Sequence, residues 1–118
     1  MSIYKDLILD HYKNPRYRGE LKKYTIKKVS INPSCGDQIT FYILIKDNVI
    51  KEVSYTSTGC VISQAAASII AEKIINKKLS EIDKMSQQEL LDLMGIDQYS
   101  ARTKCALLPL ETVKKITQ

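Results

Sequence analysis

The spacing of apolar residues changes along the chain from helical to strand-like and back to helical. At the start, a helix of about ten residues is indicated by side chains that recur on one side of it: Ile3, Leu7, Ile8 and His11. Ser2 can cap this helix, and Asn14-Pro15 ends it because the residue before a proline avoids helical backbone angles. The pattern therefore predicts one amphipathic helix at the N-terminus.

Three β-rich stretches follow, over residues 24–31, 38–46 and 50–57. In the second stretch, apolar side chains alternate with other residues, as in a strand with one buried face: Ile39, Phe41, Ile43 and Ile45. Asp47-Asn48 has the composition of a hairpin turn between the second and third stretches. Together these features predict an antiparallel sheet.

Helical patterns return in the second half of the chain. The signals are an alanine- and isoleucine-rich run over 65–74, a capping box at 86–89, Gly95 as a helix end and a last helix over 103–116. A helix, three strands and then helices predict an α+β fold, a three-stranded antiparallel sheet with helices packed on one face. The length of 118 residues suits a single domain over 1–118.

The composition is that of an ordinary globular protein, with 44% apolar and 26% charged residues. No apolar run approaches the roughly 20 residues that span a bilayer. The first ten residues are charged and amphipathic, unlike a signal peptide. We therefore expect a cytoplasmic protein that has no membrane partner.

The net charge of +5 is concentrated in the first half of the chain. Basic residues cluster there with tyrosines between them: Lys13, Arg16, Arg18, Lys22, Lys23, Lys27 and Lys28, with Tyr12, Tyr17 and Tyr24. This combination occurs on nucleic-acid surfaces, but a solvated face or a docking patch for an acidic protein has the same composition. Because no nucleic-acid-binding motif is present, we expect no nucleic-acid partner.

The three cysteines, Cys35, Cys60 and Cys105, are 25 and 45 residues apart. An odd number without an export signal argues against a disulfide framework, and the separations do not match paired C-x-x-C zinc motifs. Each cysteine lies at a predicted junction, and Cys60 and Cys105 fall at the fronts of helices, where the helix dipole favours a thiolate. The alternative is that each is a small buried apolar side chain.

Asp37 adds a fourth candidate ligand. Residues two apart in an extended segment share a face, so Cys35 and Asp37 can point to the same place. Three sulfurs and one carboxylate suit tetrahedral zinc, and iron accepts the same donors. Alternatively, Asp37 caps a strand or pairs with a lysine.

Four segments together resemble the iron–sulfur cluster assembly scaffold family, the IscU/SufU proteins related to the N-terminal domain of NifU. They are Asp10-His11-Tyr12-Lys13-Asn14-Pro15-Arg16, Asn32-Pro33-Ser34-Cys35-Gly36-Asp37, Gly59-Cys60-Val61-Ile62-Ser63 and Arg102-Thr103-Lys104-Cys105-Ala106. They occur in the family's order over nearly the whole chain. The resemblance implies an α+β sandwich with its site at one exposed end.

The resemblance also implies chemistry and partners. Carried over by position, the metal ligands are Cys35, Asp37, Cys60 and Cys105. Family members receive persulfide sulfur from a pyridoxal-phosphate cysteine desulfurase and work with downstream cluster acceptors or assembly proteins. SufU types hold zinc and act as sulfurtransferases, whereas IscU types assemble a [2Fe–2S] cluster, here on Cys35, Cys60 and Cys105. The expected function is zinc-dependent sulfur acceptance, and the alternative is a cluster scaffold.

Two departures from the family bear on the subtype. IscU proteins have a histidine directly before the third cysteine, where this chain has Lys104, and the Arg102–Cys105 form is SufU-like. The insertion of about twenty residues typical of SufU is missing. The only histidine, His11, lies in the first helix and is interpreted as a packing residue or partner contact.

The resemblance further suggests how sulfur is received. We expect Cys35 to be the sulfur acceptor, with Cys105 as the alternative and Arg102 as an auxiliary group that stabilises a thiolate or persulfide. Expected first-helix contacts to the desulfurase are Tyr4, His11, Tyr12, Lys13 and Arg16. A third possibility is a small zinc-stabilised domain that binds RNA or protein through its basic half.

Overall fold

The structure is a computed structural model that describes residues 3–33 and 36–117. Cys35 and the predicted cap Ser2 therefore lie outside the described residues. The elements, in chain order, are α1 (Ile3–Lys13), β1 (Ile26–Asn32), β2 (Asp37–Lys46), β3 (Val49–Thr58), α2 (Val61–Ile74), α3 (Leu79–Asp83), α4 (Gln87–Met94), α5 (Thr103–Lys114) and the 3-10 helix η1 (Lys115–Thr117).

The three strands form one antiparallel sheet in the order β1-β2-β3. The turn between β2 and β3 is made by Asp47 and Asn48, whose φ angles of 56° and 62° match the left-handed backbone of a tight hairpin turn. At the other end of the sheet, Asn32 of β1 pairs with Asp37 of β2, and Gln38 pairs with Thr58 of β3. The predicted sheet and hairpin are confirmed.

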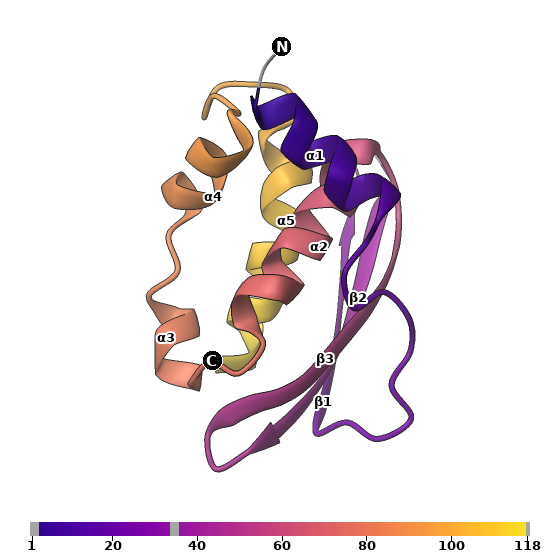
Figure 1. The fold of residues 1–118 in the computed structure, drawn as a ribbon, viewed down its shortest axis with the longest axis vertical. Helices are drawn as coiled ribbons and strands as arrows, with labels where there is room; N and C mark the ends of the chain where they lie inside the picture. Colours follow the sequence, from indigo (N-terminus) through magenta and orange to yellow (C-terminus); the bar gives the residue numbers. More distant parts are fainter. Residues whose placement is uncertain (1–2, 34–35, 118) are drawn as a thin grey trace.

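The helices pack on one face of this sheet, so the predicted α+β class is also confirmed (Figure 1). The core lies between the sheet and helices α2 and α5, and it includes Ile39, Phe41 and Ile43 of β2, Ile70 of α2 and Leu110 of α5. Alternate residues of β2 face this core, which is why the period of two was readable from the sequence. No helix among the described residues is both long and apolar enough to cross a membrane.

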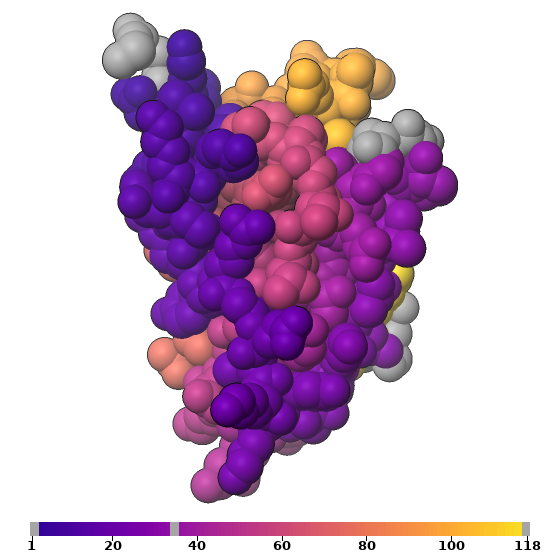
Figure 2. Space-filling view, turned by 90° about the vertical axis from the view of Figure 1, so that its right-hand side faces the viewer, coloured from indigo at the N-terminus to yellow at the C-terminus, as the bar shows by residue number. Residues whose placement is uncertain are grey.

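Helix α1 lies against α2, and Figure 2 shows the two side by side on one side of the molecule. His11 is 3% exposed, and its Nδ1 lies 2.7 Å from the hydroxyl oxygen of Ser68 in α2. The backbone N–H of Arg16 donates to the same oxygen at 2.9 Å. His11 is therefore a packing residue between α1 and α2.

Arg16 is held near this contact by two carboxylates. Its guanidinium lies 2.7 Å from Asp10 and 3.6 Å from Glu72, on α1 and α2 respectively. The hydrogen bond from Arg16 holds the pKa of the Asp10 carboxyl below its usual value and raises the pKa of Arg16. Arg16, expected to contact a partner, is thus engaged within the chain.

In the second half of the chain, the structure confirms the predicted helix α4 and contains one helix, α3, that the sequence did not predict. Helix α4 begins and ends as predicted, because Ser86 Oγ accepts the N–H of Glu89 at 3.3 Å and Gly95 takes a left-handed φ of 66°. The five-residue helix α3 was not predicted. Its Ile82 is buried in the core, and at its start the Glu81 side chain accepts the backbone N–H of Lys78 at 3.0 Å.

Candidate metal centre

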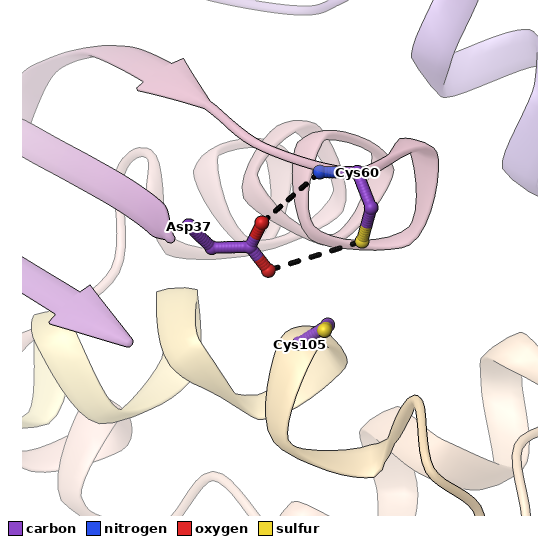
Figure 3. A group of neighbouring side chains, drawn as sticks. All are labelled: Asp37, Cys60 and Cys105. Carbon is purple, nitrogen blue, oxygen red and sulfur yellow. Dashed lines mark hydrogen bonds between the residues drawn. The ribbon is translucent and has the colours of Figure 1, made fainter. Parts of the chain in front are cut away.

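Three element ends meet at one end of the fold and bring together Asp37, Cys60 and Cys105 (Figure 3). Asp37 is the first residue of β2, Cys60 directly precedes α2, and Cys105 lies in the first turn of α5. Their candidate ligand atoms, one carboxylate oxygen and two sulfurs, all lie within 4.8 Å of one another. That spacing is short enough for a single metal ion to contact all three.

Cys60 is positioned as the N-cap of α2. Its backbone is extended, with φ −76° and ψ 167°, and its sulfur accepts the N–H of Ser63 at 3.5 Å. The Gly59 carbonyl accepts a hydrogen bond from Gln64 Nε2 at 2.9 Å, which fixes the chain just before the cap. Because a cap side chain is aimed along the helix axis, the sulfur is held at the end of the helix.

Asp37 is 1% exposed and uses its two oxygens differently. Oδ1 accepts the backbone N–H of Cys60 at 3.1 Å, while Oδ2 lies 3.8 Å from the sulfur of Cys60. A metal can therefore be bound through Oδ2 while Oδ1 keeps its hydrogen bond. Such a bond from the protein orients a ligating carboxylate and sets its direction of approach.

Cys105 is 7% exposed and lies in α5. The residues just before it, 97–103, are joined to one another by hydrogen bonds. Arg102 and Lys104, which precede it in sequence, are exposed, and neither forms an ion pair with another described residue. Two exposed cationic residues therefore lie close in sequence to a candidate sulfur ligand, and the predicted auxiliary role of Arg102 stays a prediction.

Gly59 and Ser63 belong to the site, although the sequence suggested no role for either residue. Gly59 has a φ of 142°, and a methyl group there would overlap Oδ1 of Asp37 and lie 2.9 Å from Oγ of Ser63. Ser63 is buried, and its Oγ lies 3.8 Å from the sulfur of Cys60. Their positions in the sequence could have indicated these roles, because Gly59 directly precedes the Cys60 cap and Ser63 follows it by three residues.

The structure brings three of the four predicted ligands together. Cys35 lies outside the described residues, two positions before Asp37 in the chain. His11 is not part of the group among the described residues and belongs to the α1–α2 contact. Two sulfurs and a carboxylate oxygen are donors that zinc and iron both accept, so the chemistry of the residues present fits either metal.

An α+β domain that gathers two cysteine sulfurs and an aspartate at one end of its sheet has a group of side chains that could hold a metal ion. The family model described as NifU-like N terminal domain matches residues 3–117. The chain therefore belongs to this family, which includes the IscU and SufU proteins to which it is similar.

Two relatives are similar over nearly the whole chain. The iron-sulfur cluster assembly scaffold protein IscU of Thermotoga maritima is 36% identical over 129 positions, covering 96% of this chain and 91% of the relative. The zinc-dependent sulfurtransferase SufU of Bacillus subtilis is 31% identical over 131 positions, covering 97% and 88%. Both alignments are longer than the 118-residue chain, so both relatives carry residues that have no counterpart here.

A solved structure gives the same result for the fold. The crystal structure of FiSufU, assigned to iron-sulfur cluster assembly in the SUF system of Fervidobacterium islandicum AW-1, superposes with a TM-score of 0.85. It is 26% identical in sequence and matches 100% of this chain and 96% of that one. The IscU/SufU resemblance read from the motifs is thereby confirmed.

Proposed function

We propose that this protein accepts sulfur from a pyridoxal-phosphate cysteine desulfurase at a zinc site formed by Cys35, Asp37, Cys60 and Cys105. The observation that carries the proposal is the convergence of Asp37, Cys60 and Cys105 within 4.8 Å. The similarity to a zinc-dependent sulfurtransferase supports this choice of metal and chemistry. Bound zinc would supply charge that keeps its cysteine ligands deprotonated.

The transfer itself is an exchange between sulfur atoms. The thiolate of the acceptor cysteine attacks the outer sulfur of the donor's persulfide, a new S–S bond forms on the acceptor, and the donor cysteine leaves as a thiolate. No net oxidant is required, because one S–S bond replaces another. Access to the acceptor sulfur therefore decides which cysteine reacts.

Cys35 is the proposed acceptor. Cys105 is only 7% exposed, so a donor persulfide reaches its sulfur only after α5 or its neighbours move. Cys60 is more exposed, but its sulfur is held as the α2 cap. Arg102 is exposed in the turn before α5 and can donate charge-assisted hydrogen bonds to a thiolate or persulfide at this end.

The second candidate function is a scaffold that assembles a [2Fe–2S] cluster and passes it to an acceptor protein. It is favoured by the 36% identity to a protein named IscU, and Cys35, Cys60 and Cys105 would be the cluster ligands. Lys104 stands where IscU proteins have a histidine. Lysine is not among the usual protein ligands of zinc or of iron–sulfur clusters, so Lys104 does not take the place of that histidine as a ligand.

Two partners and a compartment follow from this proposal. The desulfurase would approach the end of the sheet where the three ligands converge, and downstream cluster acceptors or assembly proteins would use the same end. We place the protein in the cytoplasm, where thiols stay reduced and available for exchange. The two cysteines that the structure describes form no disulfide, which suits that role.

The test uses the zinc-loaded protein and its cognate desulfurase, with production of alanine and sulfide from cysteine measured in the absence and presence of the protein. Sulfur acceptance predicts strong acceleration that is lost in the Cys35→Ser, Cys60→Ser and Cys105→Ser variants. Absence of acceleration by the zinc form, with cluster formation once iron replaces zinc, would overturn sulfur acceptance in favour of the scaffold.

A further inference from the structure

Cys60 is the more accessible of the two candidate sulfur ligands that the structure describes. It is partly exposed, whereas Cys105 is buried. On exposure alone, Cys60 is therefore better placed than Cys105 to attack a sulfur donor. Because the proposed acceptor is Cys35, the surroundings of the Cys60 sulfur must make it less reactive than its exposure implies.

Ser63 brings two hydrogen-bond donors within reach of that sulfur. Its backbone N–H donates to Cys60 Sγ at 3.5 Å, and its hydroxyl oxygen lies 3.8 Å from the same sulfur. The hydroxyl donates to the Cys60 carbonyl at 3.1 Å, so its single proton has two acceptors in range, this carbonyl and the sulfur. Ser63 is 4% exposed, so water has little access to compete for that proton.

The direction of the contact between Ser63 and Cys60 depends on the state of the sulfur. A thiol can donate to the serine oxygen while the serine proton stays on the Cys60 carbonyl, as in the structure. A metal-bound thiolate can only accept, so a turn of the hydroxyl about the Cβ–Oγ bond redirects its proton to the sulfur. The Cys60 carbonyl remains satisfied after this turn, because it also accepts the N–H of Gln64 at 3.1 Å.

We propose that the Ser63 hydroxyl donates a hydrogen bond to the metal-bound sulfur of Cys60 and thereby makes this cysteine a holding ligand rather than a sulfur acceptor. A charge-assisted hydrogen bond withdraws electron density from a thiolate, and a less basic thiolate is a weaker nucleophile. Ser63 is thus a positioning residue that acts through Cys60. The choice of acceptor rests on the proposed function, whereas the hydrogen bond requires only that the site holds a metal.

The test follows the alkylation of zinc-loaded protein by iodoacetamide, with the modified cysteines mapped by mass spectrometry over time. We expect Cys60 to react about tenfold faster in Ser63→Ala than in wild type, because one hydrogen bond to a charged group is lost. Cys105 should react at an unchanged rate. Ser63→Thr keeps the hydroxyl and should stay within about twofold of wild type. Zinc content is measured for each variant before alkylation.

Cobalt(II) in place of zinc distinguishes the hydrogen bond from simple access. Sulfur-to-cobalt charge-transfer absorption moves to longer wavelength when a ligating sulfur loses a hydrogen bond, because its electrons are then more easily removed. Ser63→Ala should show this shift and Ser63→Thr should not. The matched control is Thr112→Val, which removes a buried hydroxyl that donates to the Leu108 carbonyl at 2.7 Å near the other end of α5 from Cys105. It should change neither readout.

Faster alkylation of Cys60 without a shift of the cobalt band would mean that Ser63→Ala only opens the site, and it would overturn the proposal. Unchanged alkylation would overturn it as well. Both readouts are made without the desulfurase, so the expected changes in a protein that does not accelerate the desulfurase would uphold the hydrogen bond and overturn sulfur acceptance.

The choice of acceptor is tested by adding the desulfurase and cysteine to the zinc-loaded variants. Wild type should then carry added sulfur on Cys35 alone, and Ser63→Ala should carry part of it on Cys60. Added sulfur confined to Cys35 in both proteins would overturn the role of Ser63 in selecting the acceptor.

Discussion

The carboxylate of Asp37 and the N-terminus of α2 at Cys60 are joined by two contacts of different kinds. One oxygen accepts the Cys60 N–H at 3.1 Å, and the other lies 3.8 Å from the Cys60 sulfur. The first contact positions the carboxylate and the second places it where a shared metal can bind. These two roles can be separated by substitution, because an amide can replace the hydrogen-bond acceptor but is a weaker metal ligand.

Asp37→Asn and Asp37→Ala should therefore weaken zinc binding to different degrees. Asn keeps an acceptor for the Cys60 N–H, so we expect a loss of about tenfold to a hundredfold, whereas Ala loses both contacts and should bind more weakly still. Competition with a chromophoric chelator measures both affinities. Asp47→Asn, in the exposed hairpin turn at the opposite end of the sheet, is the control. Zinc affinity of wild-type strength in Asp37→Ala would remove Asp37 from the site.

Gly59→Ala should disturb the same contact from the backbone side. The added methyl group would overlap Oδ1 of Asp37, so the carboxylate must move and give up its bond to Cys60. We expect weaker zinc binding and a free energy of unfolding lower by about 1–3 kcal/mol, measured by urea denaturation of the metal-free protein.

Gly19→Ala is a closely matched control for this experiment. Gly19 has a φ of 140° against 142° for Gly59, but a methyl group there meets no atom within 4 Å. Both substitutions place alanine at nearly the same positive φ, and only Gly59→Ala adds the overlap with Asp37. Equal losses of stability in the two variants, with unchanged zinc affinity, would show that the close approach of Gly59 to Asp37 has no consequence.

The sequence predicted the parts of this fold that depend on local chemistry. The Asp47-Asn48 turn and the Ser86 and Gly95 ends of α4 follow from backbone preferences of a few adjacent residues. Helix α3 was missed because it is only five residues long, too short for a helical period to show, although Glu81 accepts the Lys78 N–H at its start and Ile82 is buried in the core.

The positions of the cysteines and Asp37 suggested a possible metal site, but only the family resemblance indicated that these residues meet at one end of the fold. Asp37 and Cys60 are 23 residues apart in the chain, and tertiary packing alone brings them together. The spacing of Asp37 and Cys60 in the chain does not predict that contact, whereas the order of the four family motifs does. The role of Gly59 was hidden for a further reason, since it depends on where the Asp37 side chain comes to lie.

His11 should make stability depend on pH. Burial holds its pKa below the usual value, as does the positive charge of Arg16, while Glu72 and Asp10 act in the opposite direction. Ser68 accepts the N–H of Arg16 and can donate its own proton to Nδ1 of the neutral ring. The unfolded state therefore binds a proton more readily than the folded state does.

The stability that neutral His11 contributes is complete above the unfolded pKa of about 6.5 and is lost as the pH falls through the lower folded pKa. Urea denaturation at several pH values between 7.5 and 5 should show a decrease bounded by about 1.4 kcal/mol per pH unit, the effect of one proton. His11→Gln should be less stable at neutral pH and should show a shallower decrease. An identical pH dependence in this variant would mean that other groups cause it.

Cys35→Ser tests which sulfur receives the persulfide. In the zinc-loaded protein mixed with desulfurase and cysteine, we expect wild type to gain the mass of one sulfur atom and Cys35→Ser to gain none. Cys105→Ser should lose acceptance only through loss of zinc, so any Cys105→Ser protein that retains zinc should still be modified at Cys35, because Cys105 is buried and is not the attacking thiolate. Zinc content must be measured for each variant, since serine is a weaker ligand than a thiolate. A metallated Cys35→Ser protein that acquires sulfur at the wild-type rate would exclude Cys35 as the acceptor, and the mapped position of the added sulfur would then distinguish Cys105 from Cys60.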